Sequence, residues 1–251
     1  MTHALEIANV SVDYGENRIL SEINLQITEG EIVCLIGASG CGKSTLLNVV
    51  AGLIPAAAGN ILMDGKYVRG PSSERVMVFQ DDAVFPWMTV QQNVDFGLRV
   101  KGLSNQKRRE IVAQKIAQVE LQGFEKMFPR QLSGGMRKRV DLARAIAVSP
   151  KIILMDEPYG ALDAMTKERL QVQFLQLCEQ TKATAIFVTH DLEEALFLGD
   201  RVVVLGRNPG HVAHIIDVPF KHPRNTDMKR SQEFQSLRGE LTRFIASADR
   251  K

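Results

Sequence analysis

The sequence contains few cysteines and no long apolar run. Its 251 residues include 3 cysteines, Cys34, Cys41 and Cys178, an odd number without metal-site spacing. Such a sparse set argues against a disulfide scaffold and is typical of the reducing cytosol. No stretch approaches the roughly 18 apolar residues that a membrane-spanning helix needs, and the first residues lack the pattern of a secretory signal. We therefore expect any membrane association to occur through a partner.

The sequence also has almost no excess of positive or negative charge. The formal net charge is +2, from 31 Lys and Arg against 29 Asp and Glu, so the sequence gives no electrostatic reason to expect a nucleic-acid partner. A length of 251 residues is at the upper end for one hydrophobic core. It suits one α/β domain with an inserted subdomain.

A complete phosphate-binding loop follows an apolar segment near the N-terminus. Residues 31–36 are nearly all apolar, as in a strand buried on both faces. The loop that follows reads Gly37-Ala38-Ser39-Gly40-Cys41-Gly42-Lys43-Ser44-Thr45. Its glycines let backbone N–H groups converge on phosphate oxygens, and a helix from about Gly42 adds the positive end of its dipole. Lys43 is then placed to reach the β- and γ-phosphates, and Ser44 to bind Mg²⁺.

A second glycine-rich turn, Ser133-Gly134-Gly135, precedes a run of helix-forming residues, 136–147. Ser133 is a good N-cap, and the glycines leave the helix N-terminus open to an anion. Positive charges near that end oppose the helix dipole unless an anion compensates them; they are Arg137, Lys138 and Arg139. Alone, the turn is more often an ordinary helix cap. Beside the first loop, it indicates a second phosphate-binding half-site.

Two carboxylates end another apolar segment. Asp156 and Glu157 directly follow residues 151–155, Lys-Ile-Ile-Leu-Met. Ligands of α/β sheets gather at the carboxyl ends of parallel strands, so both side chains should face the phosphate loop. Asp156 would hold Mg²⁺, and Glu157 would orient or deprotonate the water that attacks the γ-phosphate. A solvated acidic pair is the alternative.

Two further polar residues follow apolar runs. Gln80 comes after residues 76–79, and His190 comes after residues 185–189. Both should lie at the same edge of the sheet as the carboxylates. A lone histidine of this kind is usually structural, but several strand ends that suit one phosphate chemistry favour a common site.

These elements, in this order, resemble the ATP-binding cassette (ABC) family over nearly the whole chain. Walker A matches Gly37 to Thr45, and the family signature matches Leu132 to Met136. Walker A alone is shared with many nucleotide hydrolases, whereas its combination with a downstream Leu-Ser-Gly-Gly is highly specific. The other matches are Tyr14 for the adenine-stacking aromatic, Gln80 for the Q-loop, Asp156 and Glu157 for Walker B and the catalytic glutamate, Ala161-Leu162-Asp163 for the D-loop, and His190 for the switch histidine.

The resemblance implies an ABC-type ATPase with ATP and Mg²⁺ as ligands. It assigns catalytic roles to Lys43, Gln80, Glu157 and His190, and Mg²⁺ binding to Ser44, Gln80 and Asp156. It assigns ATP binding within the chain to Tyr14, Gly37, Ala38, Ser39, Gly40, Cys41, Gly42, Lys43, Ser44, Thr45 and Asp163. It assigns Ser133, Gly134 and Gly135 to the ATP of a partner subunit.

In this family the signature of one cassette completes the ATP site of another, head to tail about a two-fold axis. The resemblance therefore implies a homodimer, or a pair with a paralogue, that closes on ATP and opens after hydrolysis. It also implies integral membrane permease subunits and, indirectly, an extracytoplasmic solute-binding protein. The chain would lie peripherally at the cytoplasmic face of the inner (plasma) membrane.

The expected fold is α/β. It is a P-loop NTPase core with a mixed, mainly parallel sheet, an N-terminal antiparallel β-subdomain and an inserted α-helical ABC subdomain. Residues 5–7 and 23–27 alternate apolar and polar, as antiparallel strands with one wet face do. We expect the nucleotide-binding core over 1–83 and 151–217, the helical signature subdomain over 84–150, and a C-terminal helical tail over 218–251.

Two segments leave a choice. The only tryptophan, Trp87, follows Gln80, in the region where the family receives the coupling helix of the membrane subunit. It either anchors that partner from an exposed position or fills the core of the helical subdomain. In the tail, Phe234 and Leu241 belong to an amphipathic helix that either lies on a membrane or packs on its own domain. Packing on its own domain is the expected outcome.

Local patterns point to one branch of the family. Glu157-Pro-Tyr-Gly-Ala-Leu-Asp163 and Phe85-Pro-Trp87 resemble the nitrate/sulfonate/taurine importers. The leading hypothesis is the ATPase subunit of a bacterial importer for a small anion: nitrate, taurine or an alkanesulfonate, bicarbonate or similar. A soluble ABC ATPase without a membrane partner is one alternative, and a P-loop kinase or GTPase, which the signature disfavours, is another. The signature departs from the family at Met136 and Lys138, where Gln is frequent, and Lys138 is expected near the partner's γ-phosphate.

Overall fold

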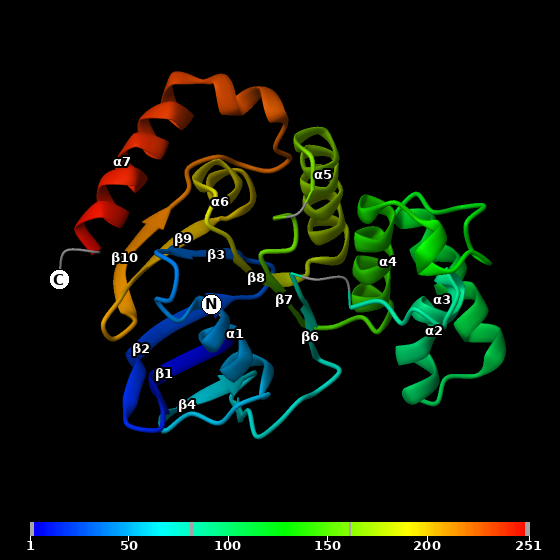
Figure 1. Cartoon of the computed structure of the whole chain (residues 1–251), viewed down its shortest axis with the longest axis horizontal. Helices are drawn as coiled ribbons and strands as arrows, with labels where there is room; N and C mark the ends of the chain where they lie inside the picture. The colour runs from blue at the N-terminus through cyan, green and yellow to red at the C-terminus, as the bar shows by residue number, and fades with distance from the viewer. Residues whose placement is uncertain (1–2, 81–82, 161, 249–251) are drawn as a thin grey trace.

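Two sheets form the framework of the molecule (Figure 1). The computed structural model describes residues 3–80, 83–160 and 162–248. The larger sheet has six strands in the order β10-β9-β3-β8-β7-β6. In chain order they are β3 (Ile32–Gly37), β6 (Arg75–Val78), β7 (Ile152–Asp156), β8 (Thr184–Val188), β9 (Arg201–Gly206) and β10 (His211–Asp217).

The strands from β9 to β6 run parallel, and β10 joins the edge antiparallel. The register pairs Leu35 with Val188 and Asp156 with Val188, so β8 ends between the ends of β3 and β7. All five parallel strands therefore end at one edge of the sheet. Residues that follow these strands meet there, as the sequence predicted.

The smaller sheet is antiparallel, with the order β2-β1-β4-β5. Its strands are β1 (His3–Tyr14), β2 (Asn17–Thr28), β4 (Ala58–Met63) and β5 (Lys66–Tyr67). Alternate apolar residues of β2 are buried, including Ile23, Leu25 and Ile27. Helix α1 (Lys43–Ala51) shares one apolar cluster with these strands and with one face of the larger sheet. The α/β class and the antiparallel N-terminal sheet are confirmed.

The opposite face of the larger sheet is covered by helices. Alternation along β3 divides its side chains, since Val33 and Leu35 pack toward α1 while Ile32, Cys34 and Ile36 pack toward the helical side. The covering helices are α5 (Ala164–Thr181) and α6 (Leu192–Leu198). A strand buried on both faces explains the nearly continuous apolar run that the sequence shows here.

Three helices project to one side, away from α7 (Figure 1). They are α2 (Val90–Val100), α3 (Asn105–Gln118) and α4 (Gly134–Ala147), and a short 3₁₀ turn, Pro129–Gln131, precedes α4. α2 begins at Val90 because Thr89 and Gln92 form a capping box.

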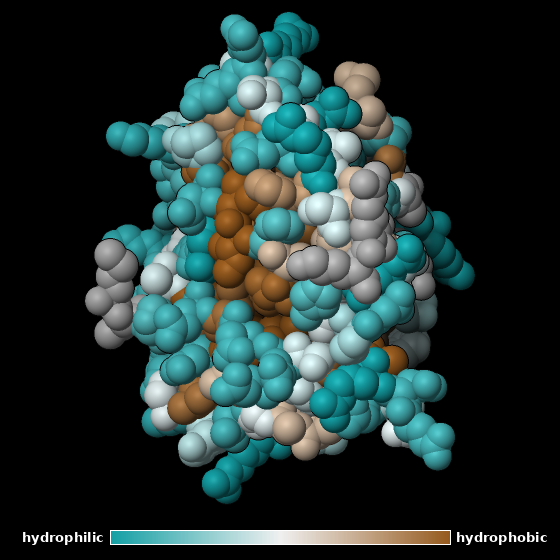
Figure 2. Space-filling model, turned by 90° about the vertical axis from the view of Figure 1, so that its left-hand side faces the viewer, coloured by the Kyte–Doolittle hydropathy of each residue, from teal (hydrophilic) through white to brown (hydrophobic). Residues whose placement is uncertain are grey.

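The C-terminal tail returns to the sheet. A 3₁₀ segment, Thr226–Arg230, leads into α7 (Gln232–Ala248), whose Phe234 and Leu241 are 0% and 1% exposed. The Arg224 guanidinium is buried and donates to the backbone oxygens of Phe197 (3.1 Å) and Gly199 (2.8 Å). The expectation that this helix packs on its own domain is confirmed. Figure 2 shows the side where α7, β10 and β2 lie, with an apolar band between hydrophilic side chains.

Candidate functional site

The phosphate loop lies between β3 and α1, and its geometry depends on glycine. Gly42 has φ +97°, and a Cβ built on it would lie 2.4 Å from Cδ2 of Leu20, so a larger residue fits neither the backbone nor the space. Lys43 begins α1 and is 7% exposed. Its ammonium donates to the carbonyl oxygens of Gly37 (2.9 Å) and Ala38 (3.1 Å), so it closes the loop from within.

A hydroxyl and a carboxylate meet beside this loop. The Ser44 Oγ donates to Oδ1 of Asp156, at the end of β7, over 3.1 Å. Burial raises the pKa of Asp156, and the nearby charge of Glu157 raises it further. The hydrogen bond from Ser44 lowers the pKa but does not cancel the rise. An approaching cation would therefore be favoured at this carboxylate, because it would relieve the cost of holding the charge there.

The next residue joins a second strand end. Glu157 has φ +43°, and its N–H donates to the Val188 oxygen over 3.0 Å. This backbone position turns its side chain toward β8, where Oε2 lies 2.9 Å from Nδ1 of His190. His190 is the more open partner, with a side chain 68% exposed against 22% for Glu157. A carboxylate and an imidazole are thus paired at the edge where the sequence predicted both.

Polar residues of α5 and α6 hold the segment around His190 in place. The Thr189 hydroxyl donates to Glu194, which also accepts from Nε2 of Gln171 on α5 over 2.9 Å. Lys167 of α5 pairs with Asp191 at 2.7 Å. Burial raises the pKa of Glu194 against these hydrogen bonds. The residue on each side of His190 is therefore held by α5 and α6.

Gln80 follows β6 and is exposed. A Cβ built on Gly160 would lie 3.8 Å from its Nε2, which places Gln80 beside the segment that follows Glu157. Lys138 contradicts its prediction. It is only 4% exposed, and its ammonium donates to the carbonyl oxygens of Phe79 (2.8 Å) and Gln80 (3.0 Å) within the same chain. The Lys138 ammonium is buried because Lys138 lies on the face of α4 that packs against the end of β6.

The second glycine-rich turn caps α4 as expected. The Ser133 Oγ accepts from the Met136 N–H over 3.2 Å, and α4 begins at Gly134. A Cβ on Gly135 would lie 2.6 Å from Cγ2 of Thr166, so a larger residue there would require Thr166 of α5 to shift. Among the described residues, no hydrogen bond joins Ser133, Gly134 or Gly135 to the phosphate loop. Within the described ranges, hydrogen bonds therefore do not connect the two glycine-rich segments.

The two remaining predicted residues lie apart. Asp163 caps α5, where its Oδ1 accepts from the Thr166 N–H over 3.0 Å, and hydrogen bonds to Thr166 lower its pKa. Ala161, part of the expected D-loop, is outside the described residues. Tyr14 is 51% exposed at the end of β1. Within the described part of the chain, no hydrogen bond or ring contact links Tyr14 to the phosphate loop.

Comparison with known proteins decides the family. The model of a family described as ABC transporter matches residues 20–160. The chain belongs to the ABC transporter family. It is 44% identical to a putative ATP-binding protein of Brucella abortus (strain 2308), over 96% of this chain and 93% of that protein. It is also 44% identical to the taurine import ATP-binding protein TauB of Escherichia coli (strain K12), over 86% of this chain and 85% of TauB.

Solved ABC structures match the fold. A bacterial ABC transporter cassette solved as a dimer, MJ0796, matches with a TM-score of 0.76 and 33% identity, over 86% of this chain and 100% of that one. The cbiO1 subunit from Clostridium perfringens has a TM-score of 0.80 over 98% of each chain at 23% identity, so it supports the fold alone. As an ABC cassette, the chain is an ATPase, and MJ0796 is also known in a post-hydrolysis state bound to ADP and Pi.

The segment after Gln80 of this ABC cassette presents an exposed aromatic. Trp87 is 69% exposed, so the alternative that it fills the core of the helical subdomain is wrong. Its ring lies 5.6 Å from that of Phe85, which lies 4.7 Å from Phe96. Asn93 is fully buried and donates from Nδ2 to the oxygens of Phe85, Met88 and Thr89, which fixes the loop beneath Trp87. No helix within the described ranges is long and apolar enough to cross a bilayer.

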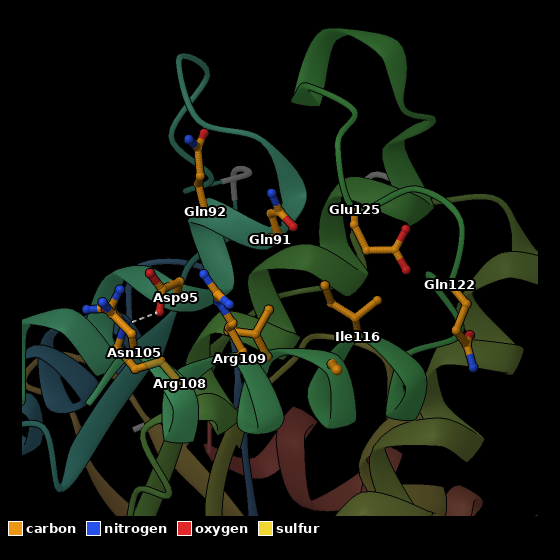
Figure 3. A pocket seen from close by; sticks show the side chains of 11 residues that line it. Gln91, Gln92, Asp95, Asn105, Arg108, Arg109, Ile116, Gln122 and Glu125 are labelled. Atoms are coloured by element: carbon orange, nitrogen blue, oxygen red, sulfur yellow. Dashed lines mark ion pairs between the residues drawn. The ribbon is translucent and has the colours of Figure 1, made fainter. Parts of the chain in front are cut away.

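A groove of about 540 Å³ lies between α2 and α3 (Figure 3). Figure 3 shows Gln91 and Asp95 from α2 and Arg109 from α3 around it, with Asp95 paired to Arg108 at 2.9 Å. The lining combines amides, an arginine, and the apolar side chains of Val112 and Ile116. This mixture suits an amphipathic protein segment better than a purely apolar ligand.

Several supporting residues were not found from the sequence. Glu194, Gln171 and Asn93 look like ordinary helix-surface residues, although their side chains are buried. A polar residue at a core position of the helical period is the signal that reveals such groups.

Proposed function

We propose that this chain is the ATP-hydrolysing subunit of a bacterial ABC importer for a small anion. The observation that carries the proposal is the pair of contacts at one sheet edge, Ser44 with Asp156 and Glu157 with His190. They give a metal-binding pair and a base with its partner beside a phosphate loop. The import role is supported by TauB, a taurine import protein that is 44% identical to this chain.

ATP phosphates would bind the loop from Gly37 to Thr45. The Lys43 ammonium already lies inside the loop, where its two carbonyl partners are exchangeable for phosphate oxygens. Tyr14 would stack on adenine from the adjacent hairpin, which contacts the loop through Leu20 and Gly42. The backbone N–H groups and the start of α1 supply the remaining positive potential.

Ser44, Asp156 and Gln80 fit a Mg²⁺ site. The hydroxyl and carboxylate oxygens of the first two converge within 3.1 Å, and Gln80 adds an amide oxygen from the neighbouring strand end. These are the hard oxygen donors that Mg²⁺ prefers. When bound there, Mg²⁺ supplies charge neutralisation of the β- and γ-phosphates.

Glu157 would act as the general base for the attacking water. The Nδ1 of His190 contacts its carboxylate at 2.9 Å and would hold it in place. His190 is exposed enough to contact the γ-phosphate side of the site. Gln80 would position the water and the metal together, and Lys43 would neutralise the charge that develops on the γ-phosphate.

A second subunit would complete each site. Ser133, Gly134 and Gly135 open α4, and in the part of the chain that the structure describes no hydrogen bond joins them to their own phosphate loop, so they would be available to the ATP of a partner. Head-to-tail pairing of two copies, or of this chain with a paralogue, gives two composite sites. Asp163 at the start of α5 would line the same interface. ATP binding would close the dimer, and hydrolysis would open it.

The Trp87 loop and the groove between α2 and α3 would receive the permease. Both belong to the proposed helical signature subdomain, residues 84–150, inserted between the core segments 1–83 and 151–217. Exposed Trp87 is a suitable anchor because its ring packs against the ring of Phe85. The chain would then lie peripherally at the cytoplasmic face of the inner membrane. A solute-binding protein on the other side would select the cargo, as nitrate, a sulfonate such as taurine, bicarbonate or a similar anion.

Reconstitution tests the proposal. The chain is combined in liposomes with the permease subunits and the solute-binding protein of its own system, and uptake of labelled taurine, nitrate and bicarbonate is measured. We expect uptake of one anion that requires ATP and Mg²⁺ inside and is lost in Glu157→Gln. ATP hydrolysis without binding to any permease would contradict the importer and favour a soluble ABC ATPase.

A further inference from the structure

The inner face of α4 carries two cations that hold the segment after β6. Lys138 donates to the oxygens of Phe79 and Gln80 at 2.8 and 3.0 Å. One and a half turns later, Arg144 donates to the oxygen of Ala83 and covers the Phe85 ring at 5.1 Å. Asp141 lies between them and pairs with Arg144 at 2.7 Å. Side chains of α4 therefore bind backbone oxygens at Phe79, Gln80 and Ala83.

The same helix presents the signature at its N-terminus. Lys138 is four residues from Gly134, so its Cα lies about one helical turn from the residue that would meet the partner's ATP. It is 4% exposed, and an ammonium so placed is retained only when it is bound to acceptors. Gln80, at its other end, would meet the ATP of its own chain. Lys138 thus links the helix that begins at the signature to the backbone of Gln80.

We propose that Lys138 is a positioning residue that couples the two ATP sites of the dimer by tying Gln80 to the signature helix. The inference rests on the proposed function of Gln80 and of residues 133–135. When ATP moves Gln80, the two hydrogen bonds transmit the shift to α4 and align the signature for the partner's ATP. Because coupling is reciprocal, engagement of the signature also favours ATP at the chain's own site.

Three variants isolate this link. Lys138→Met removes the ammonium with little change in length or helix propensity, and Lys138→Arg keeps a cationic donor. Lys115→Met is the matched control, since Lys115 is another buried lysine, 8% exposed, on α3 of the same helical group, with Nζ 3.0 Å from Gln118. Thermal unfolding with and without ATP shows which variants are folded.

Two readouts are compared. The first is the ATP concentration that half-saturates dimer formation in the Glu157→Gln background, by size-exclusion chromatography with light scattering. The second is the affinity of the monomer for a fluorescent ATP analogue. In Lys138→Met we expect roughly tenfold more ATP for dimerisation, within the usual range of allosteric coupling, and unchanged monomer affinity. Lys138→Arg should retain most of the coupling, and Lys115→Met all of it.

The inference is overturned if Lys138→Met dimerises at the ATP concentration of the parent, if it loses monomer affinity in the same proportion, or if Lys115→Met behaves in the same way. If Lys138→Met does not fold, Lys138→Ala decides, since it also removes both hydrogen bonds and keeps a good helix former, and an unchanged midpoint refutes the coupling. Absence of ATP-driven dimerisation in the Glu157→Gln parent would instead contradict the proposed function, and monomer ATP binding would still be measured.

Discussion

Nδ1 of His190 lies 2.9 Å from Oε2 of Glu157, across the ends of the adjacent strands β8 and β7. The two residues are 33 positions apart in the chain, yet the parallel register brings them together. Thr189, which precedes His190, is fixed by buried Glu194. The pair is thus built into the folded edge of the sheet.

His190→Ala should lower kcat for ATP hydrolysis by about 10² to 10⁴, the range for a group that acts in proton transfer. Lys43 and the phosphate loop are untouched, so the affinity for ATP should change little. Steady-state hydrolysis and equilibrium binding measure the two quantities. His214→Ala is the control, because His214 stacks on Phe244 of α7, in the C-terminal tail. Equal losses in both variants would contradict a role for His190.

Complementation should reveal the head-to-tail arrangement. Ser133→Arg is predicted to disable the partner's site, and Lys43→Ala the chain's own site. In a mixed dimer with one substitution on each subunit, both lesions fall in the same composite site and the other site is intact. If both are on one subunit, both sites are damaged. Hydrolysis by purified, differently tagged dimers should be higher in the first arrangement, and the reverse order would refute pairing in trans.

Trp87→Ala should weaken binding to the permease by at least about tenfold, because an exposed tryptophan that packs on a neighbouring ring is a suitable interface hot spot. Affinity is measured by titrating the ATPase subunit onto permease in nanodiscs. Tyr67→Ala serves as control, since Tyr67 of β5 is also exposed, 59%, but belongs to the smaller sheet. A Trp87 variant that binds as tightly as the control would move the docking surface elsewhere.

Lowering the pH should weaken the packing of the C-terminal tail, because Asp200 becomes protonated. Burial opposes its ionisation, but hydrogen bonds from His222 and the Ile32 N–H, with the Arg224 charge, outweigh it and hold its pKa below the ordinary value of 3.8. The stabilisation is therefore complete above pH 3.8 and is lost as pH falls through the folded-state pKa. Wild type should exceed Asp200→Asn in free energy of unfolding by about 1–3 kcal/mol at pH 6.

Urea unfolding from pH 6 to pH 3 checks this expectation. The difference between the two proteins should shrink as the pH falls below 3.8. Asp13→Asn is the control, because Asp13 pairs with Arg18 at the surface and should show a much smaller change. A difference between wild type and Asp200→Asn that stays constant over this pH range would contradict the role of the ionised carboxylate.

The residues at the edge of the sheet could be predicted from the sequence. The buried polar residues that hold them in place could not. β3 and β7 were found because apolar runs buried on both faces are continuous, and their ends fix where Gly37 and Asp156 lie. The positions of Lys138 and Trp87 depended on which face of a helix or loop meets another element. That information is tertiary. Local pattern assigned a surface charge to Lys138, whereas packing of α4 on β6 turned it inward.

The central claim is that ATP binds between the phosphate loop of one subunit and the Ser133–Gly135 turn of another. Light scattering of Glu157→Gln with and without ATP tests it most directly, because the substitution leaves both half-sites intact while it prevents hydrolysis. The account predicts a monomer without ATP, a stable dimer with ATP and Mg²⁺, and no dimer when Ser133→Arg is added. A protein that stays monomeric with saturating ATP, or dimerises equally well with Ser133→Arg, would contradict it.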